Sequence, residues 1–323
     1  MIRKLCLWIF FAKAILFSFS ACKEEQPYIN YNPPQSTFDT TYVISTIPAA
    51  QPKEVLIEDI SGIRCVNCPQ ATQIAKDIVA ANPNRVNTVT EYPNIAALGK
   101  LLIDPIDKSP FESRLDMRND VAKDVVNSIT VPSTLPSGFI NRKKFNGSLD
   151  WSQPRENWSG DVNAELLLLT PLNINLTQTY DATDKKLTVE VTVTYTQPSS
   201  GFQFVHVMLI QDSIIDSQET TDASGSTVIY DSVYVHQHVL MDMLTAHTGD
   251  LLNVDSTKTP LIAGRVFKKR FEKILSSRAA PSQIPPSSLP APQWDPKHLK
   301  ILAFVSEGAT TKYILQSKEI EVK

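Results

Sequence analysis

The sequence predicts an α/β half followed by an antiparallel β-sandwich. A buried strand at 54–60, a helix at 70–81 and a second strand at 85–91 alternate along the first half, as in α/β sheets. This pattern extends to about Asp150. After Trp158, strand-like runs rich in Val, Thr, Ile and Leu follow one another with short turns and little helix, which indicates a sandwich. A chain of 323 residues is long enough for two such domains.

The first 21 residues are predicted to be an export signal peptide. Arg3 and Lys4 supply a positive start, residues 5–19 supply an apolar stretch, and two small residues precede Cys22. The apolar stretch is too short for a good transmembrane helix, and Lys13 interrupts it.

Residues 19–22, Phe-Ser-Ala-Cys, resemble a bacterial lipobox, which implies that Cys22 is the lipidated first residue of the mature protein. The alternative is cleavage without lipid. Residues 22–52 are rich in Pro, Ser, Thr and Asn and are predicted to be a tether, whose end at 41–46 can pair as an edge strand.

The four cysteines have different predicted fates. Cys6 leaves with the signal peptide and Cys22 is blocked by its lipid. Cys65 and Cys68 therefore remain in an oxidising compartment, where they pair with each other or across molecules.

The stretch 54–81 is the best-defined element of the chain. Its strand is a short apolar run of the kind that a sheet buried on both faces uses. Pro69 is tolerated in the first turn of a helix, and Asn82-Pro83 ends the helical spacing. Cys65 is thus expected near the helix N-cap and Cys68 one turn inside the helix.

The remaining elements follow from the same patterns. Further helices are expected at 95–102 and 111–128, and a strand at 139–145 precedes a hairpin turn at Asn146-Gly147. The expected sandwich strands are 172–179, 187–195, 204–210, 228–239, 300–306 and 313–322.

Residues 55–69 resemble thioredoxin-like proteins and, more closely, a Bacteroidota outer-membrane lipoprotein family named for its twenty-eight-kilodalton member. Residues 135–142 and 234–240 are similar to that family's second and third signatures. The resemblance spans essentially the mature chain. It implies a thioredoxin-like domain at 53–158, an immunoglobulin-like sandwich at 159–323 and an outer-membrane location.

The resemblance also implies roles for the residues around the CxxC motif. Cys65 is the attacking thiol and Cys68 the resolving one, while Asp59 is the buried acid beneath them. Arg64 adds positive charge beside Cys65. In the same way, Leu135 presents backbone groups to a bound peptide next to Pro136, which is expected to be cis and to face the disulfide. Two alternatives remain. Either Pro132 is the cis proline, or Pro136 is a trans proline in a surface turn.

Three interpretations of Cys65 and Cys68 stay open: a redox-active pair, a disulfide that only pins the strand–helix turn, and a metal site. CxxC supplies two metal ligands and the rest of the α/β half has no His or further Cys, which disfavours the metal site, and no cofactor is predicted. His236 and His238 are expected on one strand face, where they form a metal site with His247 or simply a polar face.

Composition excludes some functions. The net charge of −3 gives no electrostatic case for nucleic acid, and no G-x-S-x-G elbow or phosphate loop is present. The leading hypothesis is therefore an outer-membrane lipoprotein that exchanges disulfides with thiols of exported proteins. The alternative is a non-catalytic surface lipoprotein, used for adhesion or assembly, whose disulfide is structural.

Overall fold

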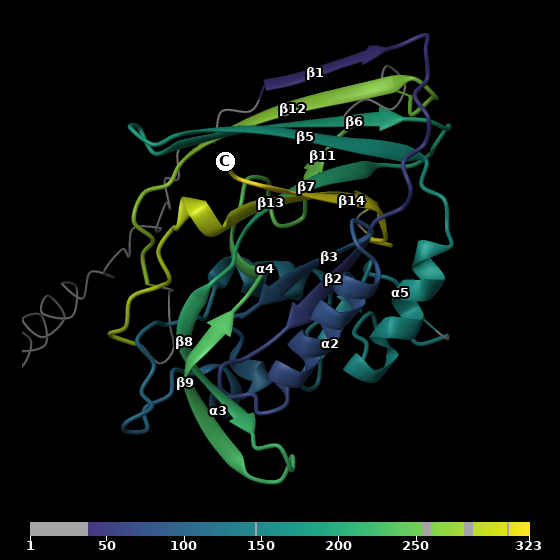
Figure 1. The fold of residues 1–323 in the computed structure, drawn as a ribbon. Helices are drawn as coiled ribbons and strands as arrows, with labels where there is room; N and C mark the ends of the chain where they lie inside the picture. Colours follow the sequence, from purple (N-terminus) through teal and green to yellow (C-terminus); the bar gives the residue numbers. More distant parts are fainter. Residues whose placement is uncertain (1–37, 146, 254–259, 281–286, 309) are drawn as a thin grey trace, which may run out of the picture. The chain divides into compact units, whose positions relative to one another are not determined.

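The computed structural model describes residues 38–145, 147–253, 260–280, 287–308 and 310–323. The predicted signal peptide, Cys22 and the tether up to residue 37 lie outside the described residues. The described part is a mixed α/β structure with many strands and few helices, which confirms the predicted fold class in this coarse form (Figure 1). Among the described residues, no helix combines the length and the hydropathy needed to cross a membrane.

The first half contains a strand–helix–strand unit that the sequence predicts well. The central strand β2 (Val55–Ile60) pairs in parallel with β3 (Val86–Glu91), and α2 (Cys68–Ala81) connects them. β2 also pairs antiparallel with β4 (Ser137–Ile140). The other elements before residue 167 are β1 (Phe38–Val43), η1 (Ala96–Leu98), α3 (Lys100–Ile103), α4 (Asp120–Ile129), η2 (Arg155–Asn157) and α5 (Trp158–Leu166).

Three predicted elements are shorter than expected. The helix predicted at 95–102 is divided into η1 and α3 at Gly99, whose φ of 92° lies outside the helical region. The helix predicted at 111–128 is present as α4 alone, and the Asn119 side chain caps it by accepting hydrogen bonds from the first-turn amides. The strand predicted at 139–145 ends at Ile140, because Asn141 and Arg142 adopt left-handed φ angles of 46° and 48° that a strand cannot accommodate.

The second half is built almost entirely from strands. The strands at 214–221, 250–251 and 265–274 and the helix α5 were not predicted from the sequence. The run predicted at 228–239 contains one whole strand, 228–236, and only the first residue of the next strand, 239–243, which belongs to a different sheet. The strands are β5 (Leu172–Asp181), β6 (Lys186–Tyr195), β7 (Gln203–Gln211), β8 (Ile214–Thr221), β9 (Val228–His236), β10 (Val239–Met243), β11 (Asp250–Leu251), β12 (Arg265–Ile274), β13 (Leu299–Glu307) and β14 (Ile314–Glu321).

These strands form two large sheets and one hairpin. The four-stranded sheet has the order β1-β12-β6-β5, so the end of the predicted tether is an edge strand, as expected. The larger sheet has the order β14-β13-β7-β10-β3-β2-β4, with β11 beside β7. β8 and β9 form a separate two-stranded sheet that extends toward the CxxC end of the first half (Figure 1).

The larger sheet crosses from one half of the sequence to the other. β10 lies parallel to β3 through the pair Val239 and Thr90, and the Thr90 amide donates to the His238 carbonyl at 2.7 Å. Strands of the first half and strands of the second half therefore lie side by side in one sheet.

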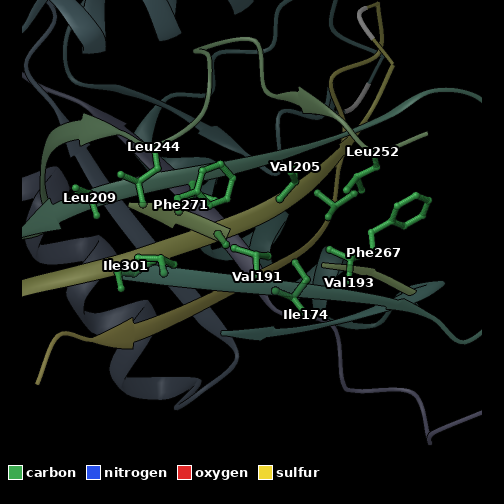
Figure 2. Close-up of a cluster of buried hydrophobic side chains, with 14 of the residues drawn as sticks. Ile174, Val191, Val193, Val205, Leu209, Leu244, Leu252, Phe267, Phe271 and Ile301 are labelled. Atoms are coloured by element: carbon green, nitrogen blue, oxygen red, sulfur yellow. The ribbon is translucent and has the colours of Figure 1, made fainter. Parts of the chain in front are cut away.

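Both faces of β7 and β13 are buried, each in a different core. Val205 and Ile301 face the four-stranded sheet, in the core that Figure 2 shows. Met208 and Phe304 point to the other face, where they pack in one cluster with Leu56 of β2 and with α4. Because one sheet contributes to both cores, unfolding of either half exposes apolar surface of the other.

Candidate functional site

Cys65 and Cys68 form a disulfide directly after β2, with an S–S distance of 2.10 Å and a Cα–Cα distance of 5.4 Å. The N-cap of α2 is Asn67, so Cys65 lies two residues before it, near the N-cap as expected. Cys68 is the first residue of the helix rather than one turn inside it as expected. The reason is a tight turn in which the Cys65 amide donates to the Gly62 carbonyl and the Cys68 amide donates to the Cys65 carbonyl. The helix N-terminus therefore lies beside Cys68.

The two cysteines are buried. Cys65 is 2% exposed and Cys68 is 1% exposed, and both belong to the apolar cluster that contains Leu135 and α4. This burial bears on the interpretations of the pair, because exchange requires another sulfur to approach one of these two.

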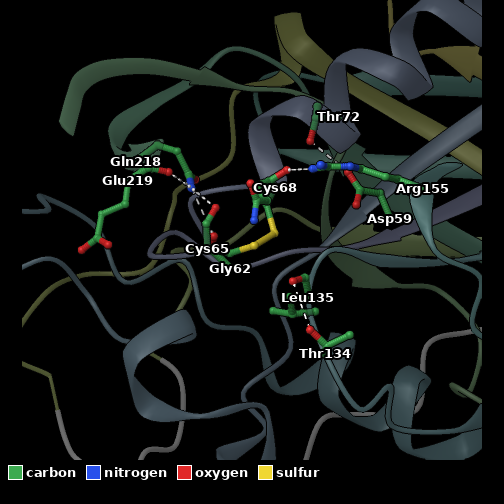
Figure 3. Close-up of a disulfide and its surroundings, with 11 residues drawn as sticks. Asp59, Gly62, Cys65, Cys68, Thr72, Thr134, Leu135, Arg155, Gln218 and Glu219 are labelled. Atoms are coloured by element: carbon green, nitrogen blue, oxygen red, sulfur yellow. Dashed lines mark hydrogen bonds between the residues drawn. A yellow bond between two sulfur atoms is a disulfide. The ribbon is translucent and has the colours of Figure 1, made fainter. Parts of the chain in front are cut away.

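The β8–β9 hairpin covers the Cys65 side of the disulfide (Figure 3). Gln218 of β8 donates from Nε2 to the carbonyls of Gly62, at 3.2 Å, and Cys65, at 3.4 Å. The Glu219 amide donates to the Ile63 carbonyl at 2.8 Å. A segment of the second half thus occupies backbone groups of the CxxC turn.

Arg64 has ion-pair partners of its own. Its Nε donates to the Glu219 carboxylate at 3.0 Å, and its Nη1 lies 3.4 Å from the exposed Asp107 carboxylate. The guanidinium that was expected to add positive charge beside Cys65 therefore helps to hold the hairpin.

Asp59 lies on the opposite side of the disulfide from the hairpin (Figure 3). It is fully buried; its Oδ2 accepts a 2.9 Å hydrogen bond from Thr72, and its Oδ1 has no partner among the described residues. Burial raises the pKa of the Asp59 carboxyl to about 7, and the Thr72 bond offsets only part of this effect.

Asp59→Asn is expected to raise the free energy of unfolding at pH 8 by roughly 2 kcal/mol or more, with little change at pH 4. An unfolded aspartate titrates near 3.8, so the folded chain loses stability as the pH rises from about 4 through about 7. Asparagine keeps an acceptor for Thr72 but never ionises. Urea denaturation at the two pH values measures the difference, and Asp77→Asn on the exposed side of α2 is the control. An equal gain at both pH values would contradict a buried, titrating Asp59.

The Leu135–Pro136 peptide bond is cis and leads into β4, as the family resemblance implies, whereas the bond before Pro132 is not cis. Leu135 is 9% exposed and packs in the same cluster as both cysteines. Its carbonyl accepts a 3.4 Å hydrogen bond from the neighbouring Thr134 hydroxyl. The predicted site residues Asp59, Leu135 and the two cysteines therefore do come together.

The three histidines do not converge. β9 ends at His236, and His238 lies in the following turn with a left-handed φ of 54°, so the expectation of one shared strand face was wrong. His236 is buried with its Nδ1 2.8 Å from the Tyr92 hydroxyl, and burial lowers its pKa to about 3. His238 lies beside Asp212, and His247 is exposed. Over the described residues, no group of three or more His, Cys, Asp or Glu has the arrangement of a metal site.

Residues near the disulfide that sequence reasoning missed come from the hairpin. Gln218 and Glu219 carry no motif, and they lie more than 150 positions from the cysteines that they cover. Tyr234, part of the third signature, packs edge-on against His236, and burial raises its pKa to about 12. Its place in that signature was the one available signal.

Part of the chain matches the model of a known protein family. The family model described as outer membrane protein Omp28 matches residues 123–278. Residues 123–278 therefore belong to the Omp28 family. This confirms the family expected from the sequence motifs. The Omp28 match runs from within α4 to beyond β12, so it includes the β8–β9 hairpin, and Cys65 and Cys68 lie outside it.

Two solved structures are similar to this chain. HBP35 of Porphyromonas gingivalis has a TM-score of 0.55 and 15% sequence identity, over 85% of this chain and 77% of that one. At this identity the likeness concerns the fold alone. A protein of Agrobacterium tumefaciens has a TM-score of 0.45 and 7% identity, over 85% of this chain and 97% of that one. This likeness is too low to establish a shared fold. No curated protein matches the sequence.

Proposed function

We propose that this protein is a non-catalytic outer-membrane lipoprotein, anchored through Cys22, in which the Cys65–Cys68 disulfide is a structural cross-link. The Omp28 match supports the outer-membrane location. The observation that carries the structural role of the disulfide is its burial, at 2% and 1% exposure of the two cysteines.

Burial matters because thiol–disulfide exchange proceeds through attack of a thiolate on a disulfide sulfur. Accessible, low-pKa cysteines are the reactive ones, whereas buried cysteines in apolar surroundings are inert. Here apolar side chains surround the pair, and Gln218 and Glu219 bind the backbone next to Cys65. In this conformation the described residues leave a partner protein little access to either cysteine.

The architecture supports a binding or assembly role. We propose that residues 53–158 are a thioredoxin-like unit, because parallel β2 and β3 flank α2 and a cis proline precedes antiparallel β4. Residues 159–323 are proposed to be an immunoglobulin-like sandwich that shares its larger sheet with that unit. The thioredoxin-like unit then serves as a rigid support for the sandwich surface.

A second candidate function is exchange with thiols of exported proteins. The specific observation in its favour is Asp59, a buried acid with a pKa of about 7 next to the disulfide turn, where a proton acceptor for a resolving thiol is useful. For this function the β8–β9 hairpin would have to leave Cys65.

The reduction potential of the pair distinguishes the two functions. The protein is equilibrated in graded thiol–disulfide buffers, quenched, and scored for free Cys65 and Cys68 with a mass-tagged alkylating reagent. A structural disulfide is expected to have a potential below about −300 mV, and a value above about −230 mV would favour exchange.

The proposed lipid anchor has its own test. Wild-type protein is expected to incorporate labelled fatty acid and to remain with the membrane fraction, whereas Cys22→Ser is expected to incorporate none. Equal labelling of the two would contradict the anchor. Labelling of intact cells with an impermeant reagent identifies the membrane face.

A further inference from the structure

One end of the four-stranded sheet carries an unusual loop surface. β1 ends there, β12 begins, β6 ends and β5 begins, because the four strands are antiparallel in that order. The loops at this end are residues 44–52, 166–171, 196–202 and 260–264, and we call them together the apolar loop end.

Backbone hydrogen bonds join these loops into one surface. The Ile44 amide donates to Gly264, and the Gly264 amide donates to Tyr195. The Thr196 amide donates to Pro171 at 2.9 Å, which brings the loop after α5 to the same place. The Asn173 side chain donates to the Ala49 carbonyl at 2.8 Å and fixes the segment 44–52 beside β5.

Large apolar side chains of these loops face solvent. Leu167 and Leu169 are each 84% exposed, within a run of four leucines at the end of α5. Exposed apolar side chains also come from the other three loops: Ile47, Phe202 and Ile262. Monomeric soluble proteins rarely group apolar side chains in this way unless the patch is a contact surface.

The described parts of these loops contain no charged residue. Residues 44–52, 166–171, 196–202 and 260–264 include no Asp, Glu, Lys or Arg, in a chain that is 20% charged. Burial of this surface in the interfacial region of a bilayer therefore removes apolar area from water without dehydrating a charge. A protein partner would commonly add polar and charged contacts at the rim of such a patch.

We propose that the apolar loop end docks on the surface of a lipid bilayer and inserts Leu167 and Leu169 into its interfacial region. The proposal rests on the membrane anchor proposed above, and the chain length fits it. Cys22 precedes Phe38 by 16 residues, which reach at most about 55 Å, whereas β1 leads from Phe38 to the apolar loop end over about 20 Å. A lipid on Cys22 and the apolar loop end can thus meet the same bilayer.

Docking of this kind sets the direction in which the disulfide faces. β2 begins at Val55, shortly after the segment 44–52, and ends at Ile60, about 20 Å further on and just before the CxxC turn. The β8–β9 hairpin and the disulfide therefore point away from the bilayer.

Vesicle partitioning tests the proposal without the lipid anchor. Residues 22–323 carrying Cys22→Ala, with the Cys65–Cys68 disulfide oxidised, are mixed with vesicles of zwitterionic phosphatidylcholine and phosphatidylethanolamine, and binding is measured by flotation. We expect measurable partitioning that changes little with salt, since no charge takes part. Leu167→Ser with Leu169→Ser is expected to lower the partition coefficient by roughly tenfold or more, because both side chains lose apolar area that would be buried.

A matched control uses apolar side chains exposed elsewhere. Val233→Ser with Val235→Ser, on the hairpin, is expected to leave partitioning unchanged. The proposal is overturned if the Cys22→Ala chain does not partition, if the leucine variant binds as well as its parent, or if the hairpin variant loses as much. Because no variant here can be acylated, these outcomes are independent of whether Cys22 carries a lipid.

Discussion

Replacing Arg142 by methionine is expected to lower the free energy of unfolding at pH 7 by about 3–5 kcal/mol. Arg142 is 2% exposed and donates three hydrogen bonds to the fully buried Glu58 carboxylate, at 2.6 Å, 2.9 Å and 3.2 Å. Methionine keeps much of the side-chain volume but leaves the buried Glu58 carboxyl without this partner.

A second carboxyl increases the expected loss. Glu91 is fully buried, and neither of its oxygens has a partner among the described residues. Burial, followed by the charge of Glu58, raises the pKa of the Glu91 carboxyl well above its usual range, and the Arg142 charge lowers it. Without Arg142, the positive charge that offsets the effect of Glu58 on Glu91 is lost.

Denaturant unfolding measures the change, and Lys123→Met is the matched control. Lys123 forms a half-exposed ion pair with Asp120 on α4, whose loss is expected to change stability by less than about 0.5 kcal/mol. The double variant Glu58→Gln with Arg142→Met is expected to recover part of the loss, since it removes both charges. If Arg142→Met lost no more stability than Lys123→Met, the buried Arg142–Glu58 pair would not be needed to stabilise the fold.

Glu165→Gln is the second large expected effect, a loss of about 3–5 kcal/mol at neutral pH. The Glu165 carboxylate is fully buried in α5 and accepts hydrogen bonds of 2.8–2.9 Å from Lys53, Lys143, Asn141 and Tyr313. These contacts join the start of β2, the end of β4, α5 and β14. Glutamine leaves the buried Lys53 ammonium without an anion.

The loss is expected to depend on pH. Burial raises the pKa of Glu165, but the hydrogen bond from Lys143 and the charge of Lys53 outweigh it and hold the pKa at about 2. Since an unfolded glutamate titrates near 4.5, the stability that ionised Glu165 contributes is present above that pH and disappears as the pH falls toward 2. The difference between wild type and Glu165→Gln should therefore shrink between pH 4.5 and pH 2. The exposed Glu156→Gln is the control, and a difference that stayed constant with pH would contradict this account.

Local patterns in the sequence predicted the first half well. The apolar run of β2, the helical spacing of α2 and Asn82-Pro83 after it are short-range signals, and each element lies within two residues of its predicted bounds. The strand after Pro136 is shorter than predicted because left-handed φ angles at Asn141 and Arg142 are not readable from apolar alternation.

Long-range pairing was not predictable in the same way. β12 contains three consecutive basic residues, 268–270, which interrupt the alternation typical of a strand, yet it pairs along its whole length with β6. The Val239–Thr90 pair joins strands that are far apart in the sequence, so local patterns do not predict it. For the candidate site, the cysteine pair and the buried Asp59 follow from the motif, whereas the cover over Cys65 comes from a hairpin remote in sequence.

The reactivity of Cys65 in the folded protein tests the central claim most directly. In a Cys22→Ala, Cys68→Ala chain, Cys65 is the thiol left in the mature protein, and its reaction with an aromatic disulfide reagent is followed by absorbance in buffer and in denaturant. We expect the folded rate to be about 100-fold or more below the denatured rate, and Gln218→Ala with Glu219→Ala to raise it. A folded rate within about tenfold of the denatured rate would show that other sulfurs can reach Cys65, and the assignment of a closed, structural disulfide would be wrong.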